Sequence, residues 1–163
     1  MGSSLLKTKI KNLTELKKII ANFKARGKKI VFTNGCFDLL HYGHIKYLGD
    51  AKSMGDILVV AINSDSSVRK IKGSKRPIIN EHDRLRTVAA LTSVDYVVPF
   101  NENTPIKVIK LLKPNVLVKG ADWKKNDIVG SNFVLSYGGR VSTVKLVRGH
   151  STSNLIKKIA KVF

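Results

Sequence analysis

Cysteine is almost absent from this chain of 163 residues, and long apolar runs are missing. The single cysteine, Cys36, excludes an intramolecular disulfide and a multi-cysteine zinc site, and it fits the reducing conditions of the cytoplasm. The longest apolar runs have the length of a strand, far below the roughly 20 residues that a membrane-spanning helix needs. The start, Met-Gly-Ser-Ser, lacks the basic and apolar pattern of a secretory signal. We therefore expect a cytoplasmic protein with no membrane partner.

Acidic residues are also scarce: the chain has 11 of them and 30 lysines and arginines. Its formal net charge is therefore +19. Such a field attracts nucleic acids, anionic membranes or phosphorylated small molecules. The basic residues are spread along the chain, and no RNA-binding signature with interleaved aromatic residues is present. Most of the excess fits a solvated lysine-rich surface, and the segment from Arg69 to Arg76 is the better candidate for binding anions. We expect no nucleic-acid partner, although a basic nucleic-acid-binding module remains the alternative of another class.

Strand-length apolar segments alternate with helical segments along the chain. Strands are expected at residues 29–33, 57–62, 96–99, 116–118 and 141–147. Helices are expected at 12–27, from 41 or 44 to 54, at 81–91, 104–113 and 127–137, and after 153, with a short helical turn and a mobile loop over 66–77. This rhythm predicts an α/β fold, a Rossmann-like doubly wound parallel sheet of about five strands in three α/β/α layers. Residues 1–28 would form an N-terminal helical extension packed on a domain of residues 29–163.

The stretch from Ile30 to Leu48 joins an expected strand, a turn at Asn34-Gly35 and a helix start that carries two histidines. The first N–H groups of a helix have no backbone partner and form a ready anion site. His41 and His44 share one helix face, and Gly43 adds no side chain that would keep a phosphate away. Histidines at this spacing are often surface or core residues, but the location at a strand end favours a polyphosphate site.

Polar clusters follow four of the expected strands, and the carboxyl ends of parallel strands share one edge of the sheet. No Ser-His-Asp or Cys-His arrangement indicates a nucleophile, while cationic groups and N–H donors are plentiful. The clusters are Asn34, Gly35, Asp38, His41 and His44; the Lys/Arg segment near residue 72; Lys119, Gly120, Asp122 and Trp123; and residues 149–153.

Two of these clusters resemble the signatures of a known family. Residues 35–44, Gly-Cys-Phe-Asp-Leu-Leu-His-Tyr-Gly-His, resemble the HxGH signature of the nucleotidyltransferase superfamily that includes the cytidylyltransferases. Residues 149–153, Gly-His-Ser-Thr-Ser, are similar to its second signature, a Ser-Thr pair that opens the last helix. Segments 60–65, 72–77, 94–99 and 118–122 look most like D-glycero-β-D-manno-heptose 1-phosphate adenylyltransferases. That activity is often fused to a sugar kinase, and the resemblance here implies the stand-alone form.

The resemblance implies that heptose 1-phosphate and ATP give ADP-heptose and pyrophosphate, for lipopolysaccharide core biosynthesis. The sugar phosphate would attack the α-phosphorus in line without a covalent enzyme intermediate, so catalysis would be positioning and charge stabilisation. The resemblance further implies a homodimer, and Mg²⁺ that binds with ATP through phosphate oxygens rather than in a protein metal site. The alternative enzyme is a cytidylyltransferase acting on glycerol 3-phosphate or a similar alcohol phosphate, because the two signatures do not separate ATP from CTP.

Residue roles follow from the same resemblance. Catalytic roles fall to His41, His44 and Lys72, with Lys75 and Arg76 competing with Lys72 for the phosphate. Nucleotide binding is expected from Thr33, Asn34, Gly35, Cys36, Phe37, Lys119, Gly120, Asp122, Trp123, Ser151 and Thr152. Sugar-phosphate binding is expected from Asp38, Asn63, Arg76 and Arg84.

Several of these residues have a purely structural alternative. Asp38 and Asp122 fit helix caps, and Trp123 fits a packing residue. Arg84 fits a surface salt bridge on its helix, with Glu81 or Asp83. Outside the predicted set, His150 fits an exposed surface histidine better than a phosphate ligand. Cys36 fits a small packing residue rather than a reactive thiol.

Overall fold

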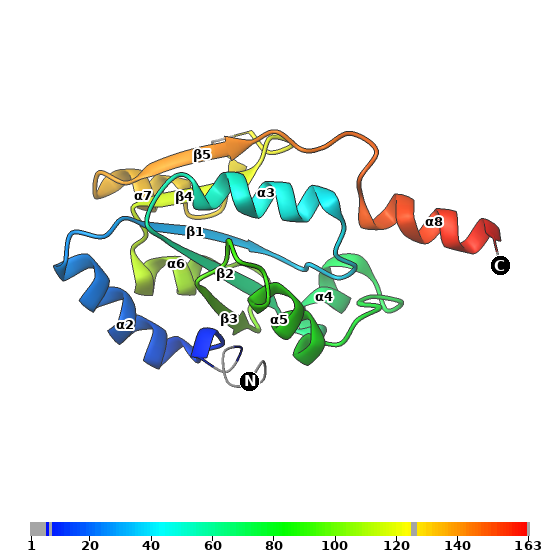
Figure 1. Ribbon diagram of the computed structural model, residues 1–163, viewed down its shortest axis with the longest axis horizontal. Coiled ribbons are helices and arrows are strands. Elements are labelled where there is room, and N and C mark those ends of the chain that lie inside the picture. Colours follow the sequence, from blue (N-terminus) through cyan, green and yellow to red (C-terminus); the bar gives the residue numbers. More distant parts are fainter. Residues whose placement is uncertain (1–5, 7, 125–126, 163) are drawn as a thin grey trace.

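The computed structural model describes residues 6, 8–124 and 127–162 (Figure 1). The expected absence of a secretory signal rests on residues 1–4, which lie outside the described residues. The strands are β1 (Ile30–Gly35), β2 (Ile57–Asn63), β3 (Tyr96–Phe100), β4 (Val116–Gly120) and β5 (Arg140–Val144). The helices are α2 (Leu13–Ala25), α3 (Tyr42–Lys52), α4 (Asp65–Lys72), α5 (Glu81–Ala89), α6 (Ile106–Leu112), α7 (Ser131–Ser136) and α8 (Thr152–Val162).

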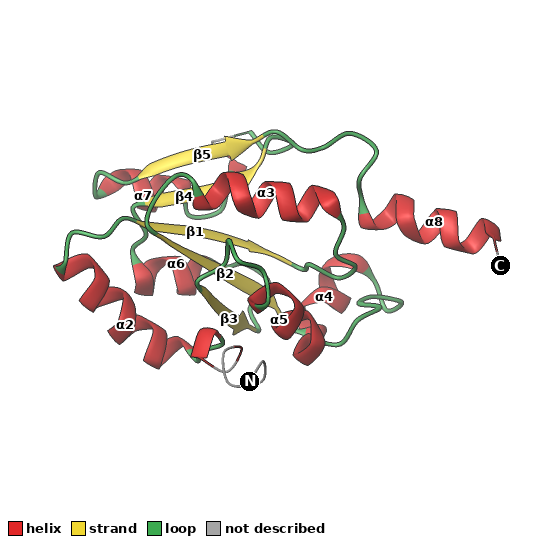
Figure 2. Cartoon of the chain, in the orientation of Figure 1, coloured by secondary structure: helices red, strands yellow, loops and turns green. Residues whose placement is uncertain are grey.

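Within the described residues, five parallel strands form one sheet in the order β3-β2-β1-β4-β5 (Figure 2). Residues of β1 alternate between the two faces, so Val31 packs with α3 and α5, whereas Ile30 and Phe32 pack with α2, α6 and α7. The predicted doubly wound α/β/α fold is confirmed. The chain runs outward from β1 to β3 and then returns to β4 on the other side of β1. Ligands of such sheets bind where this reversal leaves a crevice at the carboxyl ends of the strands.

The helix starts agree with the capping residues expected from the sequence. The side chain of Asn12 accepts a hydrogen bond from the Glu15 N–H at the start of α2, and Asn80 does the same for the Asp83 N–H in α5. The segment predicted as a short helical turn and a mobile loop begins with the helix α4, which Ser64 caps through the Ser67 N–H.

Two predicted boundaries near the C-terminus are wrong. The helix predicted from residue 127 begins only at Ser131, because Gly130 adopts a positive φ of 87° and packs close to Ile109. The last strand ends at Val144 rather than Val147. The residues between β5 and α8 therefore form a loop, and this loop passes beside the carboxyl ends of β1 and β4.

The helix α2 shares the core of the sheet's second face. Leu16 and Ile20 are fully buried beside strand residues such as Phe32 and Val98. The Lys24 ammonium donates a hydrogen bond of 2.8 Å to the carbonyl of Leu112, at the end of α6. The packing of this helix is therefore part of what holds the second face of the sheet together.

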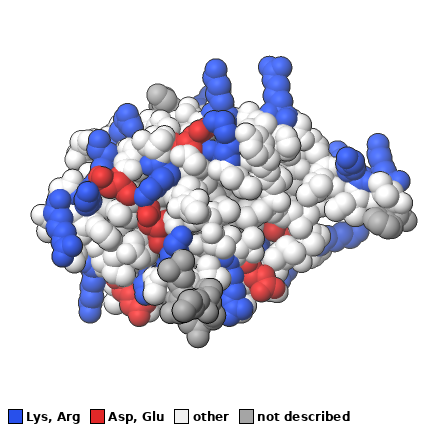
Figure 3. All heavy atoms as spheres, in the orientation of Figure 1, with Lys and Arg blue, Asp and Glu red and all other residues white. Residues whose placement is uncertain are grey.

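Lysine and arginine side chains are scattered over the face drawn in Figure 3, among far fewer acidic ones. They do not gather into one basic patch on this face, as expected for a solvated lysine-rich surface. In the part of the chain that the structure describes, no helix is both long and apolar enough to cross a membrane.

We predict that Leu16→Ala lowers the free energy of unfolding by about 3 kcal/mol, because it leaves a cavity under the sheet. Urea denaturation followed by circular dichroism measures this change. The exposed neighbour Lys17 gives the matched control, and Lys17→Ala should change the free energy by less than about 0.5 kcal/mol. Equal stability of the two variants would contradict the placement of α2 in the core.

Candidate active site

Two adjoining cavities lie at the carboxyl ends of β1 and β4, where the direction of the sheet reverses. The first cavity has a volume of about 360 Å³ and the second about 520 Å³. Residues that line both cavities are Asn34, Gly35, Cys36, Phe37, His44, Lys72, Lys119, Asp122, Trp123 and Thr152. The first cavity adds His41, Gly43, Tyr47, Gly120, Leu146, Val147, His150 and Ser151. The second adds Asp38, Asn63, Ile71, Arg76, Asn103, Thr104, Pro105, Val129 and Ser153.

The start of α3 brings two imidazoles together in the first cavity. His41 is the N-cap residue, and its ring stacks on that of His44 with 3.9 Å between the ring centroids. The Nδ1 atoms of both rings are buried and have no hydrogen-bond partner within the described part of the chain. Buried polar atoms without a partner are rare, so these nitrogens point to a ligand.

The electrostatic environment keeps these two histidines neutral at pH 7. Burial, and then the nearby His41, lowers the pKa of His44 to about 4. Burial also lowers the pKa of His41, and the charge of His150 adds to that effect. A bound anion would favour the protonated form of each ring and reverse this balance.

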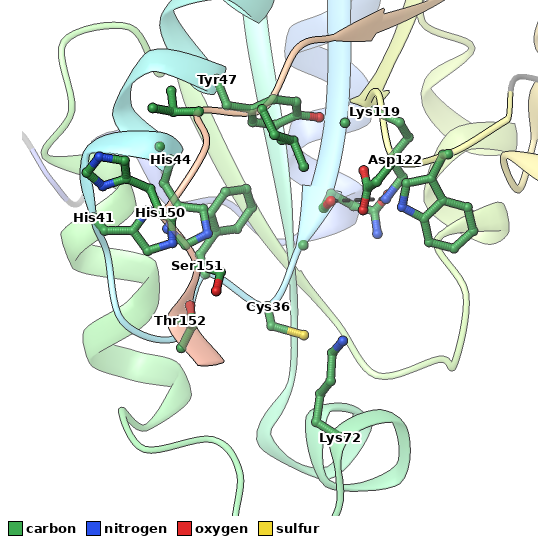
Figure 4. A pocket seen from close by; sticks show the side chains of 18 residues that line it. Cys36, His41, His44, Tyr47, Lys72, Lys119, Asp122, His150, Ser151 and Thr152 are labelled. Atoms are coloured by element: carbon green, nitrogen blue, oxygen red, sulfur yellow. Dashed lines mark hydrogen bonds between the residues drawn. The ribbon is translucent and has the colours of Figure 1, made fainter. Parts of the chain in front are cut away.

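Two lysines approach the cavities from the side away from the histidines (Figure 4). Lys119, at the end of β4, donates a hydrogen bond of 3.1 Å to the carbonyl of Asn34, and burial lowers its pKa to about 8. Its Nζ lies 5.8 Å from the centroid of the Trp123 ring. Lys72, the last residue of α4, extends toward Cys36 (Figure 4). Both cavities therefore meet cationic groups opposite the imidazoles.

Among the three basic residues that competed for the phosphate, only Lys72 lines both cavities. Arg76 lines the second cavity, and Lys75 lines neither. The Arg76 guanidinium is also committed to Asp38, with Nε 2.6 Å from the carboxylate. This placement favours Lys72 as the mobile phosphate-binding charge.

Asp38 is only 4% exposed and its acceptor atoms are occupied. Besides Arg76, it accepts hydrogen bonds from the N–H groups of Ile78 and Ile79. Burial alone would raise its pKa, but the hydrogen bonds from Ile79, Ile78 and Arg76 outweigh burial and hold the pKa below its ordinary value. Asp38 lines the second cavity, yet this geometry makes it the anchor of the segment after α4 rather than a helix cap.

Arg84, predicted to bind the sugar phosphate, lines neither cavity. It is 1% exposed, and its guanidinium bonds the carbonyls of Ile79 and Cys36 at 2.9 and 2.7 Å. It also forms an ion pair of 2.7 Å with Asp65. The alternative partners, Glu81 and Asp83, are not its ion-pair partners. Arg84 thus joins the segments after β1, after β2 and before α5.

Thr33 is the other predicted site residue that lines neither cavity. Its hydroxyl lies 2.6 Å from that of Tyr47, which in turn donates to the carbonyl of Val118 at 3.1 Å. This buried chain ties β1, α3 and β4 together beneath the first cavity. Cys36 lines both cavities, and burial raises the pKa of its thiol, partly opposed by the charge of Lys72.

The loop after β5 brings the Ser-Thr pair to the first cavity. The Thr152 hydroxyl donates to the carbonyl of Leu39 at 3.4 Å, and the Ser151 hydroxyl accepts from the Asn154 N–H at 3.1 Å. These contacts hold the start of α8 beside the loop between β1 and α3. The rest of α8 projects away from the sheet and its helices (Figure 1). The histidines of α3 and the hydroxyls of Ser151 and Thr152 therefore share one cavity.

Sequence reasoning missed several lining residues. Tyr47 lies on the buried face of α3, which gives no functional signal in the sequence. Leu146 and Val147 were assigned to a strand but lie in the loop beside the first cavity. The polar residues Asn103 and Thr104 follow the end of β3, and the rule used for the other strands would have found them.

A family model described as cytidylyltransferase-like matches residues 32–158 of the chain. The Bifunctional protein HldE of Geobacter metallireducens is 59% identical over 95% of this chain and 32% of its own length. The Bifunctional protein HldE of Aliarcobacter butzleri is 53% identical over 92% of this chain and 31% of its own length. The chain thus spans about a third of the length of the curated relatives it matches.

Solved structures show the same likeness. A crystal structure of the lipopolysaccharide core biosynthesis protein from Thermoplasma volcanium is 31% identical, with a TM-score of 0.61, over 76% of this chain and all of the other. Pantothenate synthetase from Thermus thermophilus has a TM-score of 0.66 at 14% identity, over 90% of this chain and 67% of the other. This second likeness concerns the fold alone.

We predict that Arg84→Met lowers the free energy of unfolding by about 3 kcal/mol, because two carbonyls and the Asp65 carboxylate lose their partner. The exposed Arg86, on the same helix, supplies the control variant Arg86→Met. Chemical denaturation compares the two. An Arg84 variant as stable as the control would show that the buried guanidinium does not hold these segments.

Proposed function

Because the chain belongs to the cytidylyltransferase-like family and is a nucleotidyltransferase, we propose that it transfers AMP from ATP to D-glycero-β-D-manno-heptose 1-phosphate. The products are ADP-heptose and pyrophosphate, for lipopolysaccharide core biosynthesis. The observation that carries this proposal is the shared first cavity, where the imidazoles of α3 meet the Ser-Thr pair that opens α8. The relatives named HldE and the neighbour titled as a lipopolysaccharide core biosynthesis protein support the choice of acceptor.

In this proposal the triphosphate lies in the first cavity. Its donors are the imidazoles of His41 and His44, the hydroxyls of Ser151 and Thr152, and N–H groups in the first turn of α8. Leu146 and Val147 give this cavity an apolar wall for the base. The buried Oδ1 of Asn34, which has no partner among the described residues, accepts from a sugar hydroxyl.

The second cavity receives the sugar phosphate. Asn63 and Asn103 offer amide groups to its hydroxyls, and Arg76 offers the part of its guanidinium that Asp38 leaves free. Lys72 lines both cavities and so binds phosphate at their junction. This arrangement brings the nucleophilic phosphate oxygen and the α-phosphorus to the same place, which is the main requirement for an in-line transfer.

The chemical step needs no protein nucleophile. An oxygen of the sugar phosphate forms a bond to the α-phosphorus, and the bond from that phosphorus to the bridging oxygen breaks. The leaving pyrophosphate keeps the electron pair, and the attacking phosphate is already an anion, so no proton has to be removed. His44 and Lys72 stabilise the negative charge that develops on the transferred group.

Mg²⁺ is part of the proposal as the partner of ATP, where it neutralises phosphate charge. In the described residues no three or more His, Cys, Asp or Glu side chains are grouped as a metal site. Asp38 is occupied by Arg76, and Asp122 is the remaining carboxylate of the cavities. This donor set fits an ion bound mostly through phosphate oxygens. A homodimer and a cytoplasmic location complete the proposal, on the likeness to the family.

A pyrophosphate-release assay tests the substrates by crossing ATP and CTP with heptose 1-phosphate and glycerol 3-phosphate. We expect release only with ATP and heptose 1-phosphate. The alternative, a cytidylyltransferase for an alcohol phosphate, predicts release with CTP and glycerol 3-phosphate. Release with that pair alone would refute the heptose assignment and leave the nucleotidyltransferase function intact.

We predict that His44→Ala lowers kcat by on the order of 10²-fold or more, because it removes a donor to the charge that develops during transfer. The melting temperature should stay within a few degrees of the wild-type value. His82, exposed on α5 and far from the lining residues, supplies the control His82→Ala, with unchanged kcat. Turnover of the His44 variant close to that of the control would contradict the phosphate role.

A further inference from the structure

We propose that His150 is a third phosphate-binding imidazole of the first cavity and that it binds the outer phosphates of a nucleotide in its protonated form. The proposal rests on the polyphosphate site described above but adds a residue outside the HxGH and Ser-Thr pairs. His150 is exposed, as the sequence favoured, and it also lines the first cavity.

The structure places His150 beside the rings of His41 and Tyr42. Its ring centroid lies 6.2 Å from that of His41 and 5.7 Å from that of Tyr42. It lines the first cavity directly before Ser151, and Figure 4 shows it on the same side as the α3 histidines. Three imidazoles from two distant segments of the chain thus surround one side of the cavity.

Two glycines, Gly149 and Gly43, leave room for the contact between His150 and His41. Gly149 has a positive φ of 79°, and the His150 N–H donates to the carbonyl of Val147 in a turn that leads back toward α3. On α3, a Cβ at Gly43 would lie 3.1 Å from the Cβ of His150 and 3.0 Å from the ring of His41. A side chain at residue 43 would therefore crowd both His41 and His150.

The charged groups around His150 make an anion its natural partner. From α3 it faces His41, His44 and the Tyr42 ring, and its own loop adds Ser151 and Thr152. Across the cavity lie Lys72, Lys119 and Asp122, and this carboxylate sits on the lysine side (Figure 4). None of the ion pairs among the described residues includes His150.

The charges of His41 and His150 are coupled. Charge on His150 lowers the pKa of His41, so the two rings do not take up protons independently. A polyphosphate supplies the missing negative charge, and its binding should draw a proton onto the cluster. Histidine is the side chain whose charge changes most readily near neutral pH, so this effect falls in the physiological range.

Titration calorimetry with inorganic tripolyphosphate tests the proposal without a base or a sugar acceptor. The proteins are the wild type, His150→Phe, His150→Arg and the control His82→Phe, each at about pH 6 and about pH 8. Comparing variants at the same pH removes the titration of the phosphate itself. A melting curve of each variant confirms that it is folded.

At about pH 6 we expect the wild type to bind about tenfold more tightly than His150→Phe, the value of one charge-assisted hydrogen bond. At about pH 8 this ratio should fall severalfold, because an imidazole of ordinary pKa is neutral there. His150→Arg should keep tight binding at both pH values, and His82→Phe should match the wild type. A merely structural role for His150 would not give this pattern.

An equal ratio at both pH values, equal affinities of the wild type and His150→Phe, or no binding by the wild type would each overturn the proposal. Failure of ATP and heptose 1-phosphate as substrates is a separate result. It would remove the proposed reaction but leave the tripolyphosphate comparison valid, because that experiment uses neither substrate.

Discussion

The buried guanidinium of Arg84 is the interaction on which the geometry of the catalytic edge depends. It bonds the carbonyl of Cys36 after β1, the carbonyl of Ile79 before α5 and the carboxylate of Asp65 at the start of α4. A buried charge is tolerated only when its hydrogen bonds are satisfied, and here three segments from different parts of the chain satisfy it. Asp38 supports the same region by binding Arg76 and two N–H groups. Two buried charged groups therefore hold the walls of the second cavity in place before any ligand binds.

The first cavity is organised in the opposite way, with polar atoms left unpaired. The Nδ1 atoms of His41 and His44 and the Oδ1 of Asn34 have no partners among the described residues. The desolvated Lys119, with a pKa of about 8, lies across the cavity from the two imidazoles. Unpaired buried polar atoms are costly in the free protein. A polyanion that accepts from the imidazoles, and a sugar hydroxyl that donates to the Asn34 oxygen, would recover this cost. The fold thus fixes the groups that position the loops and leaves available the groups that would contact a substrate.

Patterns that depend on local chemistry predicted the structure well. The alternation of strands and helices, the caps Asn12 and Asn80 and the meeting of polar clusters at one sheet edge are confirmed. The roles of these site residues in binding and catalysis remain predictions. Features that depend on tertiary contacts were missed. The burial of Arg84 and of Thr33 follows from partners far along the chain, and the late start of α7 follows from the φ of Gly130. His150 is exposed, as the sequence favoured, but its contact with the His41 ring spans about a hundred residues of sequence and gave no local signal.

The central claim is that a triphosphate lies between the α3 histidines and the start of α8, at the switch between β1 and β4. A crystal structure with a non-hydrolysable ATP analogue tests it most directly. The account predicts phosphate oxygens within hydrogen-bond distance of His44 and of Ser151 or Thr152. A triphosphate bound elsewhere, with these side chains facing solvent or one another, would contradict it.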